Sequence, residues 1–86
     1  MWTSVQINFS IVDGRGWCGG ACDGATLDTT RDAKEQAAAH VAAWLERHNR
    51  IFGANIIQAN VLSAYYSHRG FWHTMDEKHG WRWSVD

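Results

Sequence analysis

The chain has no proline and only two cysteines among its 86 residues. Two cysteines are too few for a scaffold held by disulfides, and without proline there is no proline-rich linker between separate units. No apolar run reaches the roughly 20 residues of a membrane-spanning helix, and the N-terminus lacks the basic and apolar regions of a signal peptide. We therefore expect one domain over residues 1–86, located in the cytoplasm, with no membrane partner.

A basic excess is also missing. Eight Lys and Arg stand against nine Asp and Glu, which makes the formal net charge −1 with the five His neutral. General electrostatic capture of nucleic acid or anionic lipid is therefore not expected. The charge is unevenly distributed, because no acid lies between Glu46 and Asp76, a stretch that holds three Arg and three His. The chain is also too short for a complete Rossmann domain or a TIM barrel.

The N-terminal third has the pattern of a β-hairpin. Apolar and polar residues alternate from Val5 to Ile11, which is typical of a half-buried strand. Residues 13–16 then supply turn chemistry. A second, antiparallel strand is predicted to begin at Trp17, and its glycines indicate an edge strand or a bulge.

A long helix is predicted to follow, from Thr30 to Phe52. Thr29 and Asp32 match a variant of the capping box, and Gly53 is suited to end the helix in a left-handed conformation. Apolar or aromatic residues recur at spacings of three and four and predict the face that packs on a sheet. The large side chains expected there are Val41, Trp44, Leu45 and Phe52.

Two segments complete the expected sheet. Residues 55–66 fit a strand with Ile57, Ala59, Val61, Ser63 and Tyr65 on one face, or a short helix; their β-branched and aromatic content favours the strand. Alternation over residues 71–75 and 81–85, with a turn between, predicts a final hairpin. The predicted fold is α+β: a small antiparallel sheet in the order β-β-α-β-β-β, with one helix packed across one face.

Two motifs are weighed for cofactor or metal chemistry. Gly14-x-Gly16-x-x-Gly19 has the spelling of a dinucleotide-binding loop, but the predicted helix begins about ten residues too late to hold a phosphate at its N-terminus. Cys18 and Cys22 together with His68 and His73 have spacings compatible with zinc; the alternative is unliganded or paired thiols and scattered histidines. We predict no metal and no cofactor.

No arrangement typical of catalysis is found. The chain has no serine in a nucleophile elbow and no H-E-x-x-H pair. Cys18 with one of the histidines is the residual candidate for nucleophilic chemistry, and a chain this short has little room for both a core and a catalytic pocket. We predict that the protein is not an enzyme.

Six tryptophans are the main anomaly of composition. Trp44 belongs to the helix stripe, and Trp81 and Trp83 share one predicted strand face, which is expected to be the face beneath the helix. Because one helix covers one sheet face, other aromatics are expected to stay exposed or to meet a partner. The alternative is that all of them fill the core. Trp, Tyr and Arg are frequent anchors of interfaces, so the predicted partner-binding residues are Tyr66, Arg69, Trp72 and Arg82.

The layout of residues 13–14, 24–26 and 30–33, a strand, turn, strand and helix start, resembles that of HicB-type antitoxins. In size and in the lack of catalytic motifs the chain is also similar to small phage-encoded inhibitors, including anti-CRISPR proteins. These resemblances imply an interaction module that inhibits or regulates a larger protein; a nucleoprotein complex is the other kind of target considered. The alternative is a small nucleic-acid-binding domain, with bases stacked on sheet aromatics and phosphates on Arg47, Arg50, Arg69 and Arg82.

Overall fold

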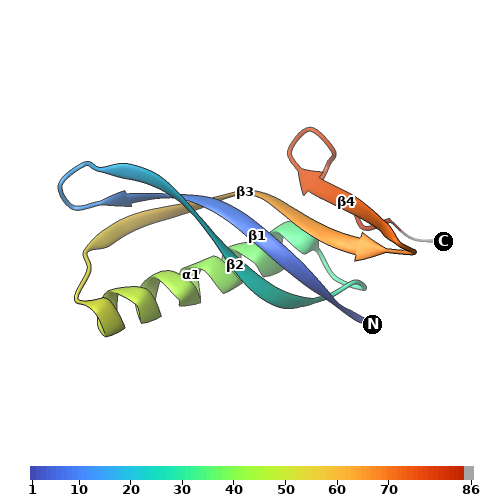
Figure 1. Cartoon of the computed structure of the whole chain (residues 1–86), viewed down its shortest axis with the longest axis horizontal. Helices are drawn as coiled ribbons and strands as arrows, with labels where there is room; N and C mark the ends of the chain where they lie inside the picture. Colours follow the sequence, from blue (N-terminus) through green and yellow to red (C-terminus); the bar gives the residue numbers. More distant parts are fainter. Residues whose placement is uncertain (85–86) are drawn as a thin grey trace.

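A computed structural model describes residues 1–84 of the chain. Its elements are β1 (Trp2–Asp13), β2 (Cys18–Asp28), α1 (Ala33–Phe52), β3 (Ile56–His68) and β4 (Phe71–Asp76). The four strands form one antiparallel sheet in the order β2-β1-β3-β4, and α1 lies across one face of it (Figure 1). The predicted α+β fold, an antiparallel sheet with one covering helix, is confirmed.

The first hairpin is long and regular. β1 and β2 pair from Trp2 opposite Asp28 to Val12 opposite Cys18 without a register shift, so the glycines of β2 cause no bulge. Gly16 adopts a left-handed φ of 86° in the turn, a conformation that glycine tolerates best. The glycine motif is therefore a hairpin turn, as predicted, and β2 is an edge strand, as predicted.

The core lies between the sheet and α1. Alternate residues of β1 point toward the helix, and Ile7 and Phe9 are almost completely buried. Small residues on α1, such as Ala37, let the helix approach the sheet closely. The buried apolar residues that form this cluster are Val5, Ile7, Phe9, Leu27, Ala33, Ala37, Val41, Ala64, Tyr66, Met75 and Trp81.

The two ends of α1 have clear causes. Asp32 is the N-cap, and its carboxylate accepts a hydrogen bond from the Glu35 N–H at 2.8 Å. The predicted capping box at Thr29 is therefore wrong: the Thr29 hydroxyl donates instead to the carbonyl of Met1. The predicted end is confirmed, because Gly53 adopts a φ of 62° and closes the helix.

The predicted core face of α1 is correct only in part. Val41 is buried, Leu45 is half-buried, and the half-buried Trp44 ring packs edge-on against Phe9 at a centroid distance of 4.7 Å. Phe52, expected on the sheet, is 70% exposed and contacts the His48 ring. The helix and the tip of the first hairpin diverge at this end, so the last helical turn has no sheet against which to pack (Figure 1).

Residues 55–66 form a strand, as favoured, but with a different face inward. Leu62 and Ile57 have no partner in β1, because the register shifts at both positions. Each shift is a bulge that reverses which residues point inward, and both skipped side chains are exposed. Of the five residues predicted to share one face of the strand, only Ala59 and Val61 point inward. The side chains that face α1 are Ile56, Ala59, Val61, Ala64 and Tyr66.

The last predicted strand is absent from residues 1–84. β4 ends at Asp76, and positive φ angles at Gly80 and Trp81 turn the chain back toward the core. Trp81 is then buried, and Trp83 packs edge-on against Tyr66 at 5.1 Å. The tryptophans thus reach the covered side of the sheet, as predicted, but without pairing to β4. Val85, also placed in that strand, lies outside the described residues.

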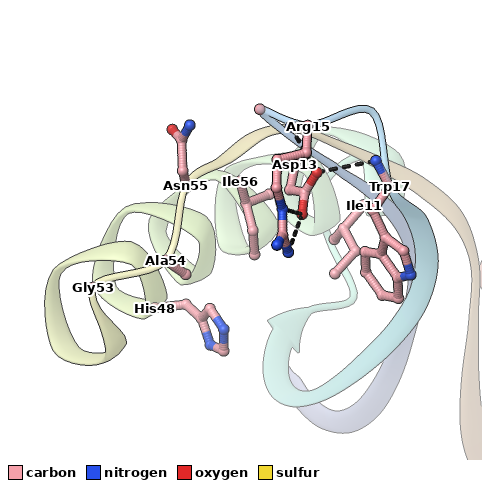
Figure 2. Close-up of a pocket in the computed structure, with 10 residues that line it drawn as sticks. Ile11, Asp13, Arg15, Trp17, His48, Gly53, Ala54, Asn55 and Ile56 are labelled. Atoms are coloured by element: carbon pink, nitrogen blue, oxygen red, sulfur yellow. Dashed lines mark hydrogen bonds and ion pairs between the residues drawn. The ribbon is translucent and has the colours of Figure 1, made fainter.

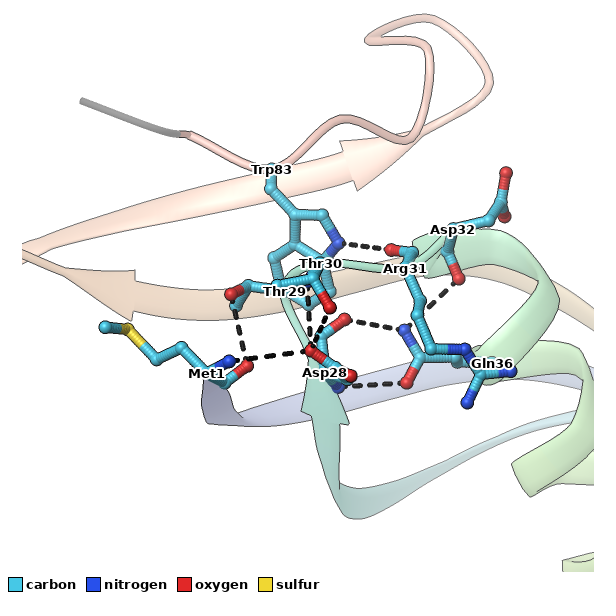
Figure 3. Close-up of polar contacts among 8 residues, drawn as sticks. All are labelled: Met1, Asp28, Thr29, Thr30, Arg31, Asp32, Gln36 and Trp83. Atoms are coloured by element: carbon cyan, nitrogen blue, oxygen red, sulfur yellow. Dashed lines mark hydrogen bonds and ion pairs between the residues drawn. The ribbon is translucent and has the colours of Figure 1, made fainter.

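A polar network holds this C-terminal segment to the start of α1 (Figure 3). The Trp83 indole N–H donates to the carbonyl of Arg31 at 2.9 Å. Asp28 accepts hydrogen bonds from the backbone and hydroxyl of Thr30 and lies 3.6 Å from the N-terminal ammonium. The Thr30 bonds, followed by the ammonium charge, hold the pKa of Asp28 below its ordinary value against partial desolvation.

Candidate functional site

The face of the sheet turned away from α1 is uncharged over most of its area. β1 contributes Ser4, Gln6, Asn8 and Ser10, and their cross-strand neighbours on β3 include Tyr65, Ser63 and Asn60. The Asn8 amide donates to the Ser63 hydroxyl at 3.3 Å. The strands contain no Lys or Arg, so every Lys and Arg of the chain lies in a turn, in the helix or in the C-terminal segment.

Two exposed aromatic side chains lie together on this polar face, and a third, Trp2, belongs to the same face at the start of β1 by strand alternation. Trp72 is 77% exposed and Tyr65 is 39% exposed. They line a shallow depression of about 420 Å³, together with Ser4, Gln6 and, from β2, Asp23 and Gly24; the Asp23 carboxylate is paired with His40. An added Cβ at Gly24 would meet nothing within 4 Å, so β2 leaves this depression open. The combination of flat aromatic surface and uncharged hydrogen-bonding groups suits contact with another macromolecule.

Three of the four predicted partner-binding residues, Tyr66, Trp72 and Arg82, line one hollow, although Tyr66 is almost completely buried there. Trp72 points away from Phe71 and His73, as strand alternation predicts. Trp72 and Arg82 line a common hollow of about 450 Å³ at the edge of β4. Arg69 lies in the tight turn between β3 and β4, with a φ of 53°, two residues after Ser67, the cross-strand partner of Trp72.

Tyr66 is the exception, because it was predicted at the surface and is only 3% exposed. Its ring stacks on His73 at 5.2 Å, and its hydroxyl accepts a hydrogen bond from the backbone N–H of Ser84. The bulge at Leu62 explains the error, since it turns Tyr66 toward the core and Tyr65 toward solvent. Tyr65 is the residue that sequence reasoning missed, and the only signal for it was its position next to Tyr66.

The candidate metal ligands do not come together within residues 1–84. Cys18 and Cys22 are both free and exposed, and no group of three or more His, Cys, Asp or Glu side chains lies close enough to hold a metal. The zinc alternative therefore has no site in this part of the chain. His40 and Asp23 form a close polar pair at 2.7 Å, which connects α1 to β2.

Comparisons with protein-family models, with curated proteins and with solved structures find no match for this chain. Within residues 1–84, no helix combines the length and the apolar character that crossing a membrane requires.

Proposed function

We propose that this chain is a non-enzymatic protein-interaction module that inhibits or regulates a larger cytoplasmic protein by covering part of its surface. The observation that carries the proposal is Trp72, a large aromatic side chain held 77% exposed on an ordered strand. Exposed tryptophans of this kind are frequent hot spots, where one residue contributes a large share of the binding energy. Phage-encoded inhibitors, which the chain resembles in size, would act in this way.

The neutral face supports a protein partner over nucleic acid. Bases stacked on Trp72 and Tyr65 would need cations nearby for their phosphates, and affinity for nucleic acid depends mainly on such contacts. Arg47 and Arg50 belong to α1, which covers the opposite face of the sheet (Figure 1). Arg69 and Arg82 remain near Trp72 and suit acidic groups at the rim of a protein interface.

The test compares two neighbouring aromatics of β4. Phe71 is 72% exposed but points to the other side of the strand from Trp72, so Phe71→Ala is a matched control for Trp72→Ala. The partner is first identified by affinity capture from the native host, and its affinity for each purified variant is then measured by calorimetry. We expect Trp72→Ala to weaken binding by at least about 2 kcal/mol and Phe71→Ala to change it little.

Two results would overturn the proposal. Full affinity of Trp72→Ala for the captured partner would exclude the predicted surface. Displacement of that partner by a short single-stranded oligonucleotide, with a steep dependence on salt, would favour the nucleic-acid alternative.

A further inference from the structure

A second surface lies at the other end of the molecule. A pocket of about 700 Å³ separates the tip of the β1–β2 hairpin from the C-terminal end of α1 (Figure 2). Ile11 and Ile56 contribute apolar surface, while Trp17 and His48 line it from the hairpin and from the helix. β3 begins at this pocket, and Trp72 pairs near the far end of β3, so the pocket is distinct from the surface proposed above.

The hairpin wall of the pocket is ordered before any ligand arrives. One Asp13 oxygen accepts the backbone N–H groups of Arg15 and Trp17, at 2.9 and 3.0 Å. The Trp17 ring lies directly on Gly19, where an added Cβ would come within 2.2 Å of the ring. Trp17 is nevertheless 57% exposed, so it presents an aromatic surface that costs little further conformational entropy on binding.

The opposite wall is fixed as well. The Asn49 side chain makes two hydrogen bonds of 2.9 Å with the backbone of Ile56, which set the path from α1 into β3. The Gly14 N–H donates to the carbonyl of Asn55 at 2.8 Å and ties the hairpin to this connection. His48 stacks on Trp44 at a centroid distance of 4.6 Å.

The charged residues that line the pocket itself, Asp13 and Arg15, are paired with each other, and at this end of the molecule three Arg stand against two carboxylates, an excess of one cation. Arg15 lies at its rim with its side chain 88% exposed, and Arg47 and Arg50 are exposed in the last two turns of α1. Two carboxylates belong to the same end of the molecule, and Asp13 is already bonded to the Arg15 guanidinium at 3.2 Å. Although desolvation opposes ionisation, the N–H groups of Trp17 and Arg15 and the guanidinium hold the pKa of Asp13 below its ordinary value. The second carboxylate belongs to Glu46, an exposed residue of α1.

We propose that this pocket binds an extended segment of a partner protein in which a bulky apolar side chain is flanked by acidic residues. The apolar side chain would enter between Trp17 and His48, and the acidic groups would meet Arg15 and the arginines of α1. A nucleic acid strand would satisfy the cations but not the apolar interior, and an uncharged apolar ligand would leave the cations unused. The inference does not rest on the role proposed for Trp72.

Three short synthetic peptides test the proposal on the full chain. The first carries one phenylalanine between aspartates, the second has lysines in place of the aspartates, and the third has alanine in place of the phenylalanine. Binding is followed by NMR on isotope-labelled protein, with the indole N–H of Trp17 as the reporter and that of Trp72 as the internal control. We expect the first peptide to shift the Trp17 signal and the backbone signals of Gly53 and Asn55.

Variants then assign the contacts. Trp17→Ala should weaken binding of the first peptide by roughly tenfold or more, and Arg15→Gln by roughly fivefold, because both change exposed side chains of the pocket. Trp72→Ala should leave this affinity unchanged. Thermal unfolding of each variant shows whether it folds; Arg15→Gln, at an exposed turn position, keeps the test usable if Trp17→Ala does not.

Several outcomes would overturn the proposal. Equal binding of the lysine peptide would remove the charge argument, and equal binding of the alanine peptide would remove the apolar one. Shifts centred on the Trp72 indole, or no shift at peptide concentrations of about 2 mM, would show that the pocket does not recognise such a segment.

Discussion

The two faces of the sheet are built from the same strands and have opposite chemistry. Along β1, Ile7 and Phe9 point toward α1 and are at most 1% exposed, whereas Gln6 and Asn8 point the other way and carry amides. The covered face supplies the apolar burial that stabilises a chain of this size. The open face supplies little of it, so its side chains are free to serve recognition.

The difference extends to charge. A surface that must only stay soluble usually carries Lys and Glu, but the strands of this sheet contain no Lys or Arg. Of their four carboxylates, Asp13, Asp28 and Asp76 lie at strand ends with local partners, and Asp23 pairs with His40 of α1. A sheet face that is mostly polar, with few charged groups and with the exposed tryptophans Trp2 and Trp72, is typical of a surface that another molecule covers.

The largest expected effect belongs to the covered face. Phe9→Ala should lower the free energy of unfolding by about 3–5 kcal/mol, because it removes apolar contacts and leaves a cavity beside Trp44. Gln6→Ala, three residues earlier on the open face, should change it by less than about 0.5 kcal/mol. Urea unfolding followed by circular dichroism measures both. Similar shifts of the two midpoints would contradict the assignment of faces.

A smaller effect tests the bulge in β3. Ala64 is completely buried, so Ala64→Leu should cost about 1–3 kcal/mol through overpacking against the helix side. Leu62 is skipped in the pairing with β1 and is 54% exposed, so Leu62→Gln should be nearly neutral. If Leu62→Gln proved the more damaging of the two in urea unfolding, the strand would have no bulge there and its faces would be exchanged.

Sequence patterns were sufficient wherever one local rule decided the structure. The alternation over residues 5–11 predicted β1 and its buried face, and Gly53 predicted the end of α1. The glycine motif was recognised as a turn because the predicted helix begins too far along the chain to hold a phosphate beside it. Trp72 was placed on the open face by counting along β4 alone.

The failures share a physical cause, which is that tertiary contacts outweighed local pattern. The two bulges in β3 arise from its pairing with β1. The alternation of residues within β3 carries no information about that pairing, so it could not predict them. Phe52 continues the helix stripe, but the sheet no longer lies beneath it. Trp81 and Trp83 alternate like a strand, yet burial of their rings against the core draws the chain away from β4. The prediction of the candidate site failed for the same reason: Tyr66 was expected at the surface but is buried, and Tyr65 is exposed instead.

A third prediction separates binding from folding on the open face. Trp72→Ala should change the free energy of unfolding by less than about 0.5 kcal/mol, since the indole is 77% exposed and pairs across the strand only with Ser67. Chemical denaturation, compared with Phe71→Ala, measures this. A decrease of several kcal/mol in the free energy of unfolding would mean that Trp72 stabilises the core. That result would support the alternative in which all tryptophans fill the core.

The smallest effect concerns the hairpin tip and its dependence on pH. Desolvation disfavours the charge on Asp13, but the N–H groups of Trp17 and Arg15 and the Arg15 guanidinium outweigh it and lower its pKa. A carboxyl whose pKa is lower in the folded state than in the unfolded state stabilises the fold above the unfolded pKa, and this contribution is lost as pH falls through the folded one. Asp13→Asn should therefore unfold at a slightly lower temperature than the parent at pH 7.

As the pH falls through the lowered folded-state pKa of Asp13, the two proteins should converge, because the parent then also becomes uncharged at this position. Thermal melts across that range measure the difference, with Glu46→Gln on exposed α1 as the control for loss of one negative charge. A gap between Asp13→Asn and the parent that stayed constant with pH would show that the carboxylate charge does not hold the turn. The preordered position of Trp17, on which the pocket depends, would then rest on its ring contact with Gly19 and on the backbone hydrogen bond of 3.0 Å from the Asp13 N–H to the Trp17 carbonyl.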